Sequence, residues 1–86
     1  MNNRQRKTFN KILETPTRPD VTWTEVGSFL KSIGVALKEG KGSRVSARLG
    51  EFYVSFHKPH PQKELKKGAV EELRKFLIAG NMRGDK

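Results

Sequence analysis

Residues 44–57, RVSARLGEFYVSFH, alternate apolar and polar side chains on both sides of Gly50-Glu51. This period of two is typical of strands buried on one face, and a glycine in the first position suits a two-residue hairpin turn. The pattern therefore predicts an antiparallel hairpin. Its opposed pairs are Leu49 with Phe52, Arg48 with Tyr53, Ala47 with Val54, Ser46 with Ser55, Val45 with Phe56 and Arg44 with His57.

The same register separates the hairpin into an apolar face and a polar face. Directly opposed residues have Cβ atoms about 4.5–5.5 Å apart, so we expect Arg44 and His57 to lie side by side. Arg48 and Tyr53 should be neighbours on the same face. The hairpin thus predicts a basic surface that bears hydroxyl and imidazole groups, opposite the core.

Two helices are predicted before the hairpin. In the first, Phe9, Ile12 and Leu13 have helical spacing, and this helix should end before Pro16, with residues 15–20 as a connector. The second begins at TWTE, residues 22–25, which has the capping-box pattern, and it ends near Gly34. Its buried stripe consists of Trp23, Val26, Phe29, Leu30 and Ile33.

A short strand is expected at 35–38, followed by a glycine-rich loop at 39–43. Pro59 and Pro61 should end the last strand, and a third helix should run from about Lys67 to Gly80. The predicted fold class is α+β, a small three-stranded antiparallel sheet with helices on one face. It resembles a double-stranded RNA-binding domain with an additional N-terminal helix. Aromatic residues on the apolar stripes, Phe52 included, are expected in the core.

The composition favours a polyanionic partner. The 86 residues contain 18 Lys and Arg against nine Asp and Glu, a net charge of +9. RNA, DNA, an acidic protein and an anionic membrane surface fit this charge. The absence of Cys excludes disulfides, thiolate–zinc sites and thiol nucleophiles. Neither a membrane-spanning run nor a secretory signal is recognisable, so a cytoplasmic protein without a membrane partner is expected.

Two further motifs flank the hairpin: GKGS at 40–43 and HPQKELKKG at 60–68. Together with the helix at 24–33 and Gly34-Val35, they resemble the HicA family of toxin–antitoxin mRNA interferases. Members of that family carry a glycine-serine-histidine loop, a hairpin, and a segment of the type P-R-H-P-G-K-E-L-K-K-G before a helix. The resemblance covers roughly residues 21–80, predicted to be a HicA-like domain. Residues 1–20 are predicted to be an N-terminal helix and connector, and 81–86 a disordered tail.

The resemblance implies an endoribonuclease, a hydrolase that cleaves mRNA without a metal or other cofactor and is neutralised by a HicB-type antitoxin. One position departs from the family pattern. Where the family's catalytic histidine follows the glycine and serine of the loop, this chain has Arg44. A guanidinium remains protonated and cannot shuttle a proton. Catalysis has therefore moved or is reduced, or the chain only binds.

The hairpin register suggests where catalysis has moved. His57 is expected one cross-strand step from the family's histidine position, and histidines accept and donate protons near neutral pH. Arg44 can hold a phosphate bidentately. We predict His57, His60 and Arg44 as catalytic residues, His60 by its match to the proline-flanked histidine of the family. Alternatively, His57 contacts phosphate only and His60 is structural. A metal site at His57 and His60 is not expected, because Cys is absent and no clear set of carboxylate ligands accompanies the two histidines.

RNA contacts are predicted around the hairpin and the segment that follows it. Residues 38–67 hold eight Lys and Arg against three acidic residues, a net charge of +5. The alternatives are that the basic face is only solvated, that the loop glycine only permits a turn, and that the tyrosine packs on the sheet. A noncatalytic nucleic-acid-binding module and a protein that docks an acidic partner also remain open. The predicted RNA-binding residues are Lys41, Gly42, Ser43, Arg48, Tyr53, Lys58, Lys63, Lys66 and Lys67.

Overall fold

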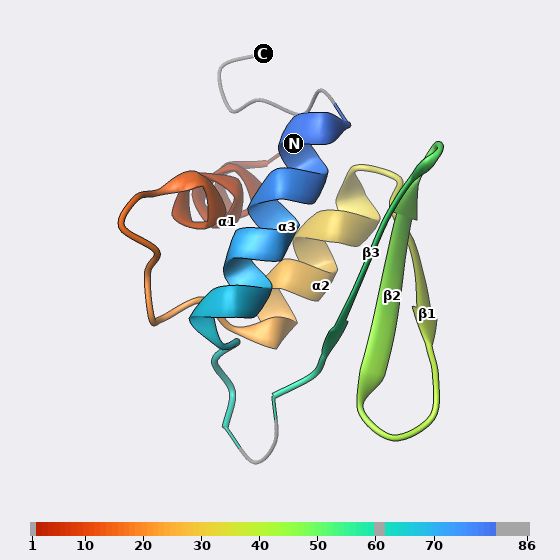
Figure 1. Ribbon diagram of the computed structural model, residues 1–86. Coiled ribbons are helices and arrows are strands. Elements are labelled where there is room, and N and C mark those ends of the chain that lie inside the picture. Colours follow the sequence, from red (N-terminus) through yellow and green to blue (C-terminus); the bar gives the residue numbers. More distant parts are fainter. Residues whose placement is uncertain (1, 60–61, 81–86) are drawn as a thin grey trace.

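Three helices lie on one face of a three-stranded antiparallel sheet (Figure 1). The computed structural model describes residues 2–59 and 62–80, so the predicted tail at 81–86 and the site residue His60 lie outside the described residues. The α+β class and the order of elements are confirmed. The elements are α1 (Asn3–Leu13), α2 (Trp23–Ser32), β1 (Ala36–Glu39), β2 (Arg44–Leu49), β3 (Phe52–His57) and α3 (Lys67–Ala79).

The β2–β3 hairpin has the predicted register at every pair, from Arg44 opposite His57 to Leu49 opposite Phe52. Gly50 begins the turn with φ of 62°, a conformation that glycine adopts without steric cost. The prediction that Phe52 belongs to the core is wrong, because its side chain is 40% exposed. It stands at the turn end of the hairpin, beside the last turn of α3, which covers it incompletely.

Strand β1 completes the sheet and leaves β2 in the centre. It begins one residue later than predicted, since pairing with β2 extends from Ala36 opposite Arg48 to Glu39 opposite Val45. Gly34, with φ of 85°, separates α2 from this strand, as its position after the helix predicted.

The core draws on all three helices and the sheet. Phe9 of α1 stacks on Phe29 of α2 with ring centroids 5.2 Å apart, and Trp23 meets Phe56 of β3 edge-on at 5.7 Å. Phe9 and Ile12 have no exposed surface. The helix at the N-terminus is therefore part of the same core as the sheet.

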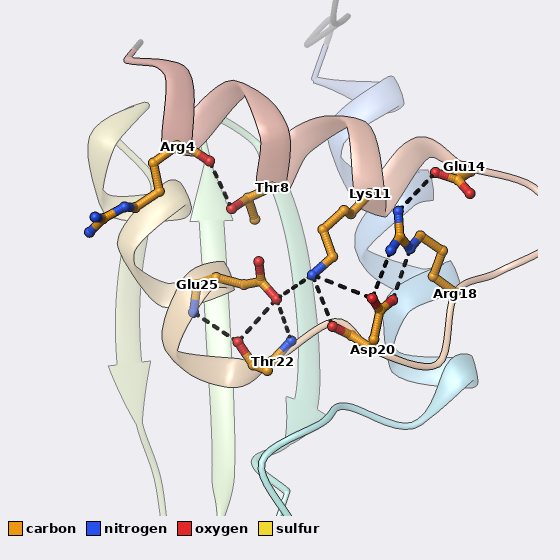
Figure 2. A network of polar contacts seen from close by, with 8 residues as sticks. All are labelled: Arg4, Thr8, Lys11, Glu14, Arg18, Asp20, Thr22 and Glu25. Atoms are coloured by element: carbon orange, nitrogen blue, oxygen red, sulfur yellow. Dashed lines mark hydrogen bonds and ion pairs between the residues drawn. The ribbon is translucent and has the colours of Figure 1, made fainter.

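A polar network ties α1 to the start of α2 (Figure 2). Lys11 Nζ donates to Glu25 Oε2 at 2.8 Å and to the Asp20 carbonyl oxygen at 2.9 Å. Glu25 also accepts from the Thr22 backbone at 2.8 Å, and Thr22 Oγ1 accepts from the Glu25 backbone at 3.3 Å, which confirms the capping box. Burial by itself would raise the pKa of Glu25, but the hydrogen bonds from Lys11 and Thr22 outweigh it and lower the pKa.

The start of α3 is held by two further sets of contacts. The Trp23 backbone donates to the Lys63 carbonyl at 3.0 Å, and the Leu65 backbone donates to the Val21 carbonyl at 2.8 Å. Arg74 of α3 donates through Nε to the Ile12 carbonyl at 2.9 Å, at the end of α1. These bonds fix α3 and the segment that leads into it against both other helices.

Helix α3 buries Val70, Leu73, Phe76 and Leu77 and is terminated by Gly80, as predicted. A Cβ at Gly80 would lie only 2.8 Å from Leu49 Cδ2, so a larger residue there would require the Leu49 side chain to move. Within residues 2–59 and 62–80, every helix is too short or too polar to cross a membrane.

Replacement of Lys11 by Met should lower the free energy of unfolding by about 1–2 kcal/mol, because two hydrogen bonds from a largely buried ammonium are lost while the apolar stem is kept. Urea unfolding measures this change. Lys7→Met is the control, since Lys7 is exposed on the same helix and should alter stability little. Equal losses in the two variants would contradict a stabilising role for the Lys11–Glu25 contact.

Candidate nucleic-acid interface

The helices lie on one face of the sheet and leave the other uncovered (Figure 1). The register and burial of β2 and β3 put the polar half of the hairpin on the uncovered face. No helix of the described part of the chain covers this face, which we call the open face. Strand β1 contributes Ala36 and Lys38, which pair with Arg48 and Ser46. The remaining members come from β2 and β3: Arg44, Ser46, Arg48, Tyr53, Ser55 and His57.

His57 is exposed at the end of β3 and lies directly opposite Arg44, as predicted. Its Nδ1 atom is 3.3 Å from Ser43 Oγ, within hydrogen-bonding distance. The backbone of Lys58 also donates to the Ser43 carbonyl at 2.7 Å. Ser43 thus orients the imidazole and leaves Nε2 for a second partner.

The loop before β2 is closed by its own backbone. Gly40 donates to the Arg44 carbonyl at 2.8 Å, and Arg44 donates to the Lys41 carbonyl at 3.3 Å. Gly42 has φ of 66°, which explains the glycine at this turn. Lys41 and Gly42 are exposed in this loop, at the same end of the hairpin as His57.

Arg48 and Tyr53 occupy the other end of the open face. They line a shallow hollow of about 380 Å³ with Ala36, Lys38 and Ser46, and the Tyr53 side chain is 64% exposed. Arg48 lies four residues from Arg44 along β2, about 13 Å at the usual rise per residue. The two arginines therefore stand near opposite ends of β2 on this face.

Lys38 was not among the predicted site residues. Strand β1, which carries Lys38, has only four residues. Its own pattern is too short to predict which of its side chains lie on the open face. The one sequence signal for the position of Lys38 was its alternation with the apolar Leu37. In the structure Leu37 is half-buried and Lys38 is exposed.

The remaining predicted basic residues lie beside the hairpin, near the start of α3. Lys63, Lys66 and Lys67 are exposed, and Lys66 lines a hollow that it shares with His57 and Lys58. Lys58 Nζ contacts Glu39 Oε1 at 2.7 Å, and this hydrogen bond lowers the pKa of Glu39. The charge of Lys58 is thus partly compensated.

Ion pairing leaves most of the predicted RNA-binding cations available. Across residues 2–59 and 62–80, the ion pairs engage Lys11, Arg18, Lys58 and Lys75, and none involves Arg44, Arg48 or Lys66. No group of three or more His, Asp or Glu side chains within that part of the chain could hold a metal ion. The open face therefore offers cations, hydroxyls and one imidazole.

A family model described as HicA toxin of bacterial toxin-antitoxin matches residues 23–77. The match spans more than half of the chain, from the first residue of α2 into the last turn of α3, and it includes Arg44 and His57. No match was found among curated proteins or among solved structures. The helices, sheet order and hairpin register are those that the sequence pattern predicted, and the chain belongs to the HicA family of toxins of bacterial toxin–antitoxin systems, with an antitoxin implied as its partner.

Proposed function

We propose that this toxin is a metal-independent endoribonuclease that cleaves single-stranded mRNA in the cytoplasm. The observation that carries the proposal is the His57 imidazole, whose Nδ1 lies 3.3 Å from Ser43 Oγ, on a residue that pairs directly with Arg44 on an uncovered basic face. An exposed proton acceptor beside an anion-binding group is what cleavage of a ribose–phosphate backbone requires.

In this mechanism Nε2 of His57 takes the proton of an RNA 2′-hydroxyl. The 2′-oxygen then attacks the adjacent phosphorus, the bond from phosphorus to the 5′-oxygen breaks, and the leaving oxygen takes a proton from water. Arg44 holds the nonbridging phosphate oxygens and stabilises the charge that develops on them. The products are a 2′,3′-cyclic phosphate, which water can hydrolyse, and a 5′-hydroxyl end.

His60 is the second predicted catalytic histidine. It would serve as the acid that protonates the leaving oxygen in place of water. Because His60 lies outside the described residues, this role rests on the sequence resemblance and stays a prediction.

RNA binding is assigned to the cations of the open face and of the segment that leads into α3. Arg48 and Lys38 would contact phosphates on one side of the cleaved bond, and Lys66 and Lys67 on the other. Tyr53, which is 64% exposed, offers a ring on which a base can stack. Single-stranded RNA fits this arrangement because its bases are free to stack while its phosphates follow the cations.

We assign the antitoxin to the HicB type and place its contact surface on the open face. The observation that supports this placement is that the cations there have no carboxylate partner within the described residues. An antitoxin that brings acidic side chains to Arg44 and Arg48 would occupy the positions of RNA phosphates. Antitoxin and RNA would then exclude one another.

Replacement of His57 by Ala should reduce cleavage of a labelled RNA in EDTA by at least about 100-fold, because general acid–base catalysis contributes roughly 10²–10⁴. RNA affinity should stay nearly unchanged, since the cations remain. Asn10→Ala, which alters an exposed polar side chain on α1, is the control. Unchanged cleavage by the His57 variant would remove the proposed mechanism.

Replacement of Arg48 by Ala should weaken RNA binding and flatten its salt dependence. One lost phosphate contact should reduce the slope of log K against log salt concentration by about 0.7. Fluorescence anisotropy at several salt concentrations measures this slope. Arg6→Ala removes the same charge from an exposed position on α1; if both variants change the slope equally, net charge and not the open face governs binding.

A noncatalytic RNA-binding module is the second candidate, and Arg44 at the histidine position of the family is the observation that favours it. Arg44→His restores that histidine and separates the two candidates. If the native chain binds RNA without cleaving it and the Arg44→His variant cleaves, the module is correct. If the native chain cleaves and the variant is slower, the enzyme is correct, because the phosphate-holding guanidinium has been removed.

A further inference from the structure

A second hollow, of about 520 Å³, lies between the end of β3 and the start of α3. Its volume falls within the range of about 300–1,000 Å³ that small-molecule sites occupy. Apolar side chains of Phe56, Pro59 and Ala69 line it. The polar lining comes from His57, Lys58, Gln62, Lys66 and Glu72, and Gly68 completes it.

Gly68 keeps this hollow open. A Cβ built at Gly68 would meet no atom within 4 Å, and the residue does not have a positive φ. Neither close packing nor backbone conformation therefore explains the glycine, which is a poorer helix former than alanine. A small residue in the first turn of α3 does leave room for a ligand.

His57 belongs to the open face and to the lining of this hollow. We propose that the hollow binds a nucleobase of the RNA strand, next to the bond that His57 cleaves. This inference rests on the proposed function and adds a base-specificity site to it. The apolar lining suits the flat face of a base, and Lys66 at the rim suits the phosphate attached to it.

Glu72 gives the hollow a preference among bases. Its carboxylate accepts hydrogen bonds and cannot donate them, and its side chain is 57% exposed, with Lys75 Nζ at 3.6 Å. Adenine, cytosine and guanine present an exocyclic amino group, which a carboxylate binds. Uracil has a carbonyl oxygen in its place, and its one donor on that edge, the ring N3–H, is flanked by two carbonyl oxygens that repel a carboxylate. Glu72 therefore disfavours uracil in the hollow.

The test compares two variants of the full chain with matched controls. Gly68→Leu should fill the hollow and slow cleavage at least about tenfold. Gly68→Ala, which adds one methyl group, should slow cleavage by a smaller factor. Glu72→Gln should reduce the discrimination against uracil about fivefold, the value of one hydrogen bond. Glu71→Gln, one residue away and outside the hollow, should leave the discrimination against uracil unchanged. Sequencing the ends cut from a random RNA pool measures the preference, and circular dichroism checks folding.

Titration with AMP, CMP and UMP, followed by amide chemical shifts, tests the hollow without cleavage. AMP and CMP should shift the amides of Gly68, Ala69 and Glu72 more than UMP does, and Gly68→Leu should abolish these shifts. If RNA is not cleaved but these shifts occur, the enzymatic proposal fails and the base site stands. If RNA is cleaved while Gly68→Leu changes neither rate nor base preference, the base site is wrong. Loss of antitoxin binding alone in Gly68→Leu would also overturn it, because the hollow would then belong to a protein interface.

Discussion

Backbone pairing between β2 and β3 is the constraint on which the core and the site both depend. Side chains alternate along a strand, so a slip of one residue would move each of them to the opposite face. The pairing that buries Val45 against Phe56 also exposes Arg44 beside His57. Burial of the apolar half is the stronger term, because each buried side chain contributes about 1.5–3 kcal/mol. The hydrophobic effect thus sets the positions of the polar groups on the open face.

In the proposed mechanism, Arg44 and His57 supply a phosphate-binding group and a proton acceptor at the position where this chain departs from the family pattern. A histidine on β2 is replaced by a guanidinium, and an imidazole stands directly across on β3. Cross-strand neighbours are as close as side chains on a sheet can be. The proposed proton acceptor and phosphate-binding group therefore occupy the same small area, with Ser43 orienting the imidazole from the adjoining loop.

Helix α1 lies outside the region that matches the family, which begins at residue 23, yet it helps to position the proposed RNA surface. Phe9 packs on α2, and Arg74 of α3 bonds to the carbonyl of Ile12. The hydrogen bond from the Leu65 backbone to the Val21 carbonyl then fixes the segment that leads into α3. Because the second hollow lies between β3 and the first turns of α3, its width depends on these contacts between helices.

The sequence by itself determined the elements and the hairpin register, because local spacing of apolar residues and the turn at Gly50 act over a few positions. The capping box at Thr22 and Glu25 could be predicted for the same reason. Only the tertiary structure decided that Lys38 joins the open face, that Lys58 is partly neutralised by Glu39, and that Glu72 shares a hollow with His57. These residues are brought together by strand pairing and helix packing between distant segments, and no local pattern encodes such contacts.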